Sequence, residues 1–250
     1  AADIKKVGHH IKDTMRALLE RALPAEGYVF DTALAAYLLD ATAGSYDLQR
    51  LFVAYFSEEL PKPAHLERDA FAPLGDTAAA WTALHSYCSA VAALYGILPQ
   101  KLREENMTEL YETVELPLCA VLARMERRGF LVDGTALAAF GEDMADRLAA
   151  LEQRIYEAAG TKFNINSPKQ LGMVLFEKMQ LPHGKKTKTG WSTSADVLEK
   201  LRWQAPIVAD ILQYRQYAKL KSTYADGLLK VIDPDGRIRT SFQMTVTATG

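Results

Sequence analysis

Apolar side chains recur every three or four positions through most of this 250-residue sequence, and that spacing is typical of amphipathic helices. Stretches rich in alanine and leucine predict helices over residues 33–39 and 76–94. A longer helix, bent at Pro117 and ended by Gly129, is predicted from an apolar face. That face consists of Leu110, Val114, Leu118, Val121, Leu122 and Met125. Strand-like alternation is scarce before the last fifteen residues, so the sequence predicts a mainly α-helical protein.

A second long helix is predicted between Asp133, which can cap a helix N-terminus, and Gly160, a common C-terminal residue. Its apolar residues are Leu137, Phe140, Met144, Leu148, Leu151 and Ile155. Because only a short turn separates it from the preceding helix, the two are expected to pack antiparallel. Ser167 and Ser194 are predicted to cap two short helices, and a third long helix is predicted over residues 206–229.

The composition excludes several classes of protein. A chain that is 49% hydrophobic and 24% charged is neither disordered nor fibrous. Its longest apolar run, near residues 88–98, is shorter than the ~20 residues of a membrane-spanning helix. The first residues lack the apolar core of a secretory signal, so we expect a cytoplasmic protein without a membrane partner. Cys88 and Cys119 fit no metal-ligand spacing and are expected to be buried thiols.

The net charge of −2 conceals an uneven distribution of charge. Residues 1–160 contain 15 Lys and Arg and 24 Asp and Glu, a net charge of −9. Residues 161–250 contain 14 basic and 7 acidic residues, a net charge of +7. A basic C-terminal third favours a polyanionic partner, and the alternative is a set of solvated faces without a partner.

The helix predicted over residues 206–229 carries the most specific polar pattern. Its apolar face is predicted to contain Ile207, Ile211, Tyr214, Ala218 and Ala225. Arg215, Lys219, Ser222 and Thr223 follow the spacing i, i+4, i+7 and i+8, which predicts a stripe of two cations and two hydroxyls. This stripe contains no carboxylate and therefore favours an anionic partner. Tyr224 flanks the stripe, and two roles stay open for its side chain: stacking on a base and packing within the protein.

Several motifs occur in one order and at consistent spacings, and together they resemble the thumb of bacterial family A DNA polymerases, the DNA polymerase I type. The thumb motifs are residues 162–171, 186–190, 192–194, 197–198, 214–215 and 219–224. Residues 115–118 and 125–129 resemble the helix that enters the thumb. Residues 236–242 and 245–250 are similar to the first strands of the palm.

The N-terminal part resembles the 3′–5′ exonuclease domain of the same family less closely. Residues 7–12 are similar to its second motif, and residues 30–32 with 35–39 to the helix that follows. Active members use carboxylates to hold two divalent metals. By the resemblance, His10 replaces an asparagine, Thr14 the metal-binding aspartate, and Trp81 and His85 the tyrosine and aspartate of the third motif. Because these oxygen ligands are missing, we expect a vestigial exonuclease site without metal.

The resemblance implies three segments: a partial, degenerate exonuclease-like domain of ribonuclease-H-like fold over residues 1–105, a helical thumb over 106–235 and the start of the palm over 236–250. It implies a fragment of a DNA-directed DNA polymerase of replication and repair, without the palm carboxylates and inactive alone. Mg²⁺ and deoxynucleotides are expected only for the intact polymerase. No obligate protein partner is evident.

The partner that the resemblance implies is primer–template duplex DNA, gripped without sequence preference. Lys188, Arg215 and Lys219 are expected to contact phosphates, and short polar groups to reach the groove and the backbone beside it. The full set of expected DNA-binding residues is Asn164, Asn166, Ser167, Gln170, Lys188, Ser192, Thr193, Ser194, Arg215, Lys219, Ser222, Thr223 and Tyr224. Two alternatives stay open: an active 3′–5′ exonuclease fragment, and a helical interaction scaffold that binds no nucleic acid.

Overall fold

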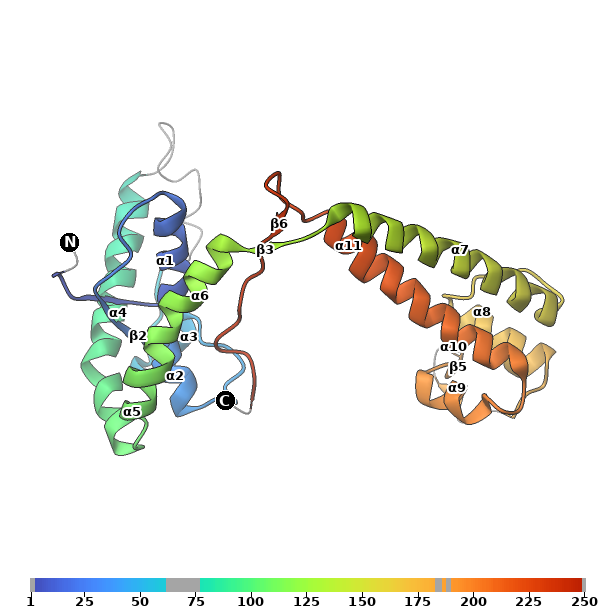
Figure 1. Ribbon diagram of the computed structural model, residues 1–250. Helices are drawn as coiled ribbons and strands as arrows, with labels where there is room; N and C mark the ends of the chain where they lie inside the picture. Colours follow the sequence, from blue (N-terminus) through green and yellow to red (C-terminus); the bar gives the residue numbers. More distant parts are fainter. Residues whose placement is uncertain (1–2, 62–76, 183–185, 188–189, 249–250) are drawn as a thin grey trace. The chain divides into compact units, whose positions relative to one another are not determined.

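Helices dominate the chain, as the sequence predicts, and the computed structural model describes residues 3–61, 77–182, 186–187 and 190–248 (Figure 1). The chain divides into two units. Unit 1 contains Ala1–Gly129 and Arg239–Gly250, and unit 2 contains Phe130–Ile238. This division by packing differs from the boundaries after residues 105 and 235 that the resemblance implies. None of the helices in the described ranges is both long and apolar enough to cross a bilayer.

Unit 1 surrounds a short parallel sheet with helices. Its elements are β1 (Lys6–Gly8), α1 (Ile11–Glu20), β2 (Tyr28–Asp31), α2 (Thr32–Leu39), α3 (Leu48–Phe56), α4 (Thr77–Glu104), α5 (Thr108–Leu110), η2 (Tyr111–Glu115) and α6 (Leu116–Arg128). Strands β1 and β2 pair in parallel. The core contains Ile11, Phe30, Leu94, Leu98 and Cys119. The other thiol, Cys88, is exposed, so the expectation that both cysteines are buried is wrong for it.

The helix predicted before Gly129 forms, but it buries a different face. Segment η2 is a π-helix, whose hydrogen bonds span one residue more than those of an α-helix. It shifts the register before α6, which begins at Leu116 and has Pro117 in its first turn. Cys119, Ala123 and Glu126 are buried, and α6 packs along α1. Much of the predicted apolar face is exposed, namely Leu110, Val114, Val121 and Met125. This helix belongs to unit 1 and the next one to unit 2, so the expected antiparallel packing of the two stays a prediction.

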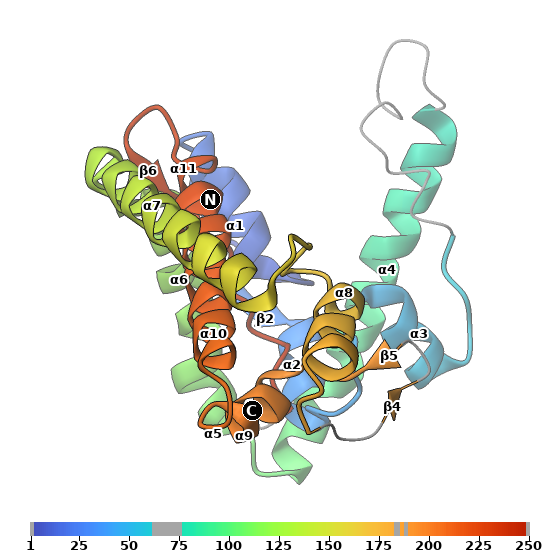
Figure 2. The same ribbon diagram turned by 90° about the vertical axis from the view of Figure 1, so that its right-hand side faces the viewer.

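Unit 2 is built on a helix that packs against a later one in the chain. Its elements are β3 (Phe130–Leu131), α7 (Gly134–Ala159), α8 (Pro168–Gly172), η3 (Met173–Lys178), β4 (Lys186–Thr187), β5 (Gly190–Trp191), α9 (Ala195–Leu201), α10 (Pro206–Lys219), η4 (Leu220–Ala225), α11 (Asp226–Leu229) and β6 (Arg237–Ile238). Helix α7 runs antiparallel to α10 and η4 (Figure 1). Helices α8 and α9 and hairpin β4–β5 lie near the end of α7 that leads to α8 (Figure 2). The core includes Ile155, Leu171, Leu198, Ile207 and Ile211.

The last residues of the chain form less strand than the resemblance implies. In the described part of residues 236–250, only Arg237 and Ile238 form a strand, and they pair with Phe130 and Leu131 within unit 2. The segment that follows belongs to unit 1 and bonds to helices there. The Phe242 amide donates to Glu126 Oε1 at 2.7 Å, and the Tyr37 hydroxyl donates to the Thr247 carbonyl at 2.9 Å. Because helices supply these partners, the described part of the segment stays irregular.

Candidate nucleic-acid interface

The end of unit 2 that contains residues 160–205, called the tip below, holds most of the expected DNA-binding residues. Asn164 organises its first turn, because its Oδ1 accepts from the Asn166 amide at 2.9 Å. Its own amide donates to Gln170 Oε1 at 2.8 Å. Ser167 Oγ accepts from the Gln170 amide at 3.4 Å, which confirms Ser167 as the cap of α8. Asn164, Asn166 and Gln170 are all exposed.

The loop Ser192–Ser194 connects β5 to α9 and contains one buried residue between two more accessible ones. Thr193 is 5% exposed, whereas Ser192 is partly buried and Ser194 is exposed. Arg215 Nη1 donates to the Thr193 carbonyl oxygen, and Nη2 donates to Thr193 Oγ1 at 3.2 Å. Ser194 occupies the N-cap position of α9, as predicted, but its side chain makes no capping hydrogen bond.

An open pocket of about 480 Å³ brings several expected residues together at the tip. Its lining residues are Asn166, Pro168, Trp191, Ser192, Thr193, Ser194 and Arg215. Arg215 is partly buried, and this burial lowers its pKa. The pocket thus combines short amide and hydroxyl groups with one cation whose side chain turns toward the loop.

Trp191 is a pocket residue that sequence reasoning missed. Its indole Nε1 donates to Glu177 Oε1 at 3.1 Å. Gly172 of α8 lies so close that an added Cβ would be 3.0 Å from Trp191 Cβ. Trp191 pairs with Lys186 in the antiparallel hairpin β4–β5. A tryptophan directly before the polar run Ser192–Ser194 is the signal that was available in the sequence.

The segment predicted as one long helix over residues 206–229 contains the other residues of the expected DNA-binding set. Ile207, Ile211 and Ala225 are buried, which confirms the predicted apolar face at these positions. Lys219 is exposed at the end of α10 and makes no ion pair with any residue in the described ranges. The exposed residues Ser222, Thr223 and Tyr224 lie in η4, a π-helix, so their angular positions differ from the predicted α-helical stripe. Lys188 lies outside the described residues.

The expected exonuclease positions lie in unit 1. His10 precedes α1 with φ 52°, and its amide donates to Asp31 Oδ1 at 3.2 Å. Thr14 and His85 are exposed, and Trp81 is 62% exposed. Among residues that the structure describes, no three histidine, cysteine, aspartate or glutamate side chains form a group that could hold a metal.

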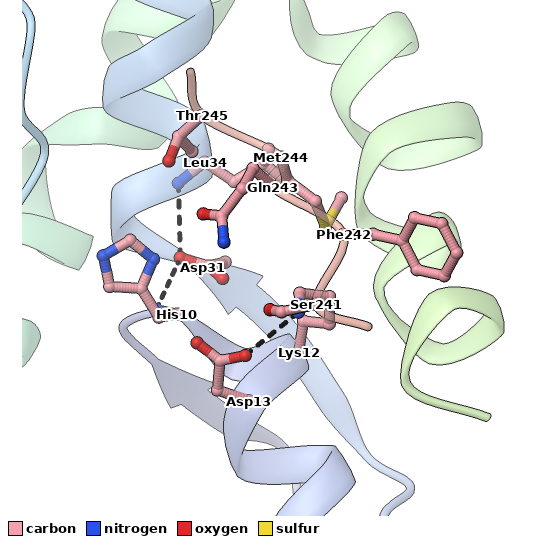
Figure 3. A pocket seen from close by; sticks show the side chains of 10 residues that line it. All are labelled: His10, Lys12, Asp13, Asp31, Leu34, Ser241, Phe242, Gln243, Met244 and Thr245. Atoms are coloured by element: carbon pink, nitrogen blue, oxygen red, sulfur yellow. Dashed lines mark hydrogen bonds and ion pairs between the residues drawn. The ribbon is translucent and has the colours of Figure 1, made fainter. Parts of the chain in front are cut away.

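A cavity of about 210 Å³ adjoins His10, Asp31 and residues 241–245 (Figure 3). Asp31 is almost completely buried, and this burial raises its pKa. Its carboxylate accepts from the amides of Ile11 at 2.8 Å and Ala33 at 2.9 Å, so one side chain caps both α1 and α2. Asp31 therefore has a structural role that its backbone partners explain.

Comparison with known proteins gives one consistent family. A sequence model of DNA polymerase family A matches residues 134–250. DNA polymerase I of Geobacillus stearothermophilus is 43% identical over 248 residues, 98% of this chain and 28% of that protein. DNA polymerase I of Bacillus subtilis (strain 168) is 42% identical over 245 residues, 96% of this chain and 27% of that protein. This chain therefore spans about a quarter of the length of these curated relatives.

A solved structure agrees in fold as well as in sequence. It is described as the POL domain of Pol1 from M. smegmatis in complex with DNA primer-template and dNTP. The two structures align with a TM-score of 0.84 at 35% identity. The alignment covers 98% of this chain and 41% of that chain.

Proposed function

This chain belongs to DNA polymerase family A, and from that premise we propose that unit 2 grips primer–template duplex DNA without reading its base sequence. The chain spans about a quarter of the length of its relatives. The whole protein is proposed to be a DNA-directed DNA polymerase of replication and repair. The observation that carries the grip is the open pocket at the tip, where exposed Asn166 and Ser194 lie beside Ser192. The similar POL domain was solved with DNA primer-template, which supports the proposal.

The exposed polar groups of the tip and the cation at the end of α10 suit a partner that is recognised by shape and charge. Exposed Lys219 can neutralise a phosphate, and each phosphate neutralised releases counterions whatever the base sequence. The minor groove presents similar acceptors at A·T and T·A pairs, so a few short donors can bond there without a base code. Asn166 and Ser194 supply such donors.

Among the residues that the structure describes, no group of three histidine, cysteine, aspartate or glutamate side chains could hold a metal. Mg²⁺ and deoxynucleotides are therefore proposed for the whole polymerase, and no catalytic step is assigned to this chain. For unit 1 we propose a vestigial exonuclease site at His10, Thr14, Trp81 and His85. Magnesium-dependent digestion of single-stranded DNA by this chain would contradict that assignment.

The grip is tested by measuring duplex affinity against salt concentration for the full chain. We expect affinity to fall steeply with salt, and Lys219→Ala to reduce the slope of log K against log salt by about one. Lys5→Ala removes an exposed charge from unit 1 and is the matched control, which should leave the slope unchanged. Binding that is independent of salt, or equal slopes for both variants, would overturn the proposal.

A further inference from the structure

We propose that Arg215 is a positioning residue for DNA binding, and that its guanidinium holds the Ser192–Ser194 loop in shape instead of neutralising a phosphate. This inference rests on the proposed function of unit 2 and assigns Arg215 a role different from that of Lys219. The two cations are one helical turn apart on α10, yet their surroundings differ. Arg215 is partly buried and bonded to the loop, whereas Lys219 is exposed.

Arg215 binds one loop residue at two points. Its two terminal nitrogens donate to different atoms of Thr193, the carbonyl oxygen and Oγ1. Among the described residues, no backbone amide donates to the Thr193 carbonyl. Because Thr193 is 5% exposed, removing Arg215 would leave its two oxygens largely shielded from solvent and without their present donor. The arginine therefore satisfies buried acceptors that the loop cannot satisfy itself.

Holding Thr193 inward determines where its neighbours point. Thr193 is 5% exposed and lies between Ser192 and Ser194, which both line the pocket, so the bonds that hold Thr193 also hold these two serines in place. Ser194 has extended backbone angles, with φ −62° and ψ 158°, and an exposed side chain. Its hydroxyl is not used in capping α9 and is available to a ligand. The geometry thus couples an interior contact to the presentation of two hydroxyls at the pocket.

The same bonds direct the cation away from a phosphate role. A guanidinium usually binds phosphate through two parallel N–H donors. Here both terminal nitrogens of Arg215 already donate to Thr193. A phosphate could pair with these same two N–H groups only by leaving the buried acceptors of Thr193 unpaired, which costs free energy. Lys219 has no such competing partner among the residues that the structure describes.

The first test compares duplex binding by the full chain and its variants. We expect Arg215→Ala to weaken binding about tenfold at every salt concentration, with less than half the slope change that Lys219→Ala produces. The paired change Ser192→Ala and Ser194→Ala should weaken wild-type binding, but change Arg215→Ala little further, because coupled sites are not additive. A slope reduction of about one for Arg215→Ala, with additive serine effects, would overturn the proposal.

A second test measures hydrogen exchange without DNA, and it separates the positioning role of Arg215 from the proposed grip on DNA. Hydrogen exchange at the amides of residues 193–198 should accelerate in Arg215→Ala, with exchange in α7 unchanged. Arg215→Lys should give an intermediate rate, because a lysine can bond only part of the same pair of acceptors. Unchanged exchange in the loop would overturn the positioning role. If the loop loosens but the wild-type chain binds no duplex, the proposed grip fails while the structural action of Arg215 stands.

Discussion

The two units use polar side chains in opposite ways. In the described part of unit 1, the buried polar or charged residues are Lys12, Asp31, Thr32 and Glu126. In the described part of unit 2, Thr193 is the single residue of this kind, and most of its candidate binding residues are exposed. Polar groups that are buried and paired hold elements together, whereas polar groups that face solvent can exchange water for a ligand. The difference agrees with a supporting role of these residues in unit 1 and with the binding role that we propose for unit 2.

Glu126 shows most clearly how unit 1 uses a buried charge. Its side chain has 0% exposure, and its Oε1 lies 2.5 Å from Lys12 Nζ. Arg16 Nη1 lies 3.7 Å from Glu126 Oε2, and the Phe242 amide donates to Oε1 at 2.7 Å. One carboxylate thus joins α1, α6 and the C-terminal segment. It connects parts of the sequence that are more than one hundred residues apart.

The largest effect is expected from removing this carboxylate. Glu126→Ala should destabilise unit 1 by about 3–5 kcal/mol, because it leaves Lys12 buried without its main partner. Asp13→Ala is the control, since Asp13 also contacts Lys12 but its side chain is 58% exposed. That change should cost below ~1 kcal/mol. Urea denaturation of the two variants measures the difference, and equal losses would remove the basis for a buried support network.

An intermediate effect is expected from His9 as the pH falls. Burial, with a smaller contribution from His10, lowers the His9 pKa from 6.5 to about 3, and Asp47 opposes this shift. The unfolded chain therefore gains a proton near pH 6.5 while the folded chain stays neutral, so stability is present above that pH and is lost toward pH 3. Between pH 7 and pH 5 the loss should be about 2 kcal/mol.

His9→Gln isolates this contribution, because glutamine does not titrate and can still bond the Thr32 hydroxyl that His9 Nδ1 contacts at 2.8 Å. The difference in unfolding free energy between wild type and variant should change with pH over this range. A difference that stays constant from pH 7 to pH 5 would show that His9 takes up a proton as readily in the folded chain as in the unfolded chain.

The smallest effects on stability are expected from two serines at helix N-termini in unit 2. Ser167→Ala should cost about 1 kcal/mol, because it removes the cap of α8. Ser194→Ala should cost less than ~0.5 kcal/mol, because that side chain makes no capping bond. Thermal unfolding checks both values. A larger loss for Ser194→Ala would show that its hydroxyl supports the fold and is not reserved for a ligand.

The sequence predicted the kinds of element better than their contacts. Helical periodicity was sufficient to locate α7 and α10, and Ile155 and Ile211 are buried as predicted, although Phe140 of the predicted face is exposed. It failed for α6, where the buried positions are Cys119, Ala123 and Glu126. Two small residues and a carboxylate give little hydrophobic signal, and the π-helix before them shifts the angular register. The neighbouring α1, with its Lys12, and the C-terminal segment, with Phe242, explain why that face is buried.

The candidate site shows the same limit. Motif order was enough to indicate the family and to point to the tip, and the pocket does bring Asn166 and the Ser192–Ser194 loop together. Sequence reasoning counted Arg215 as a free cation, because charge can be read from a sequence but hydrogen-bond partners cannot. The buried acceptors of Thr193, 22 residues away, are visible only in the structure.

The most direct test of the contrast between the units is a hydrogen-exchange footprint of duplex DNA on the full chain. The account predicts protection on binding at residues 164–170, 192–195 and 219–224 of unit 2, with no change in α1, α2 or α4 of unit 1. The protection should be the same for duplexes of different base sequence. Protection confined to unit 1, or none in unit 2 under conditions where duplex binds, would contradict the account.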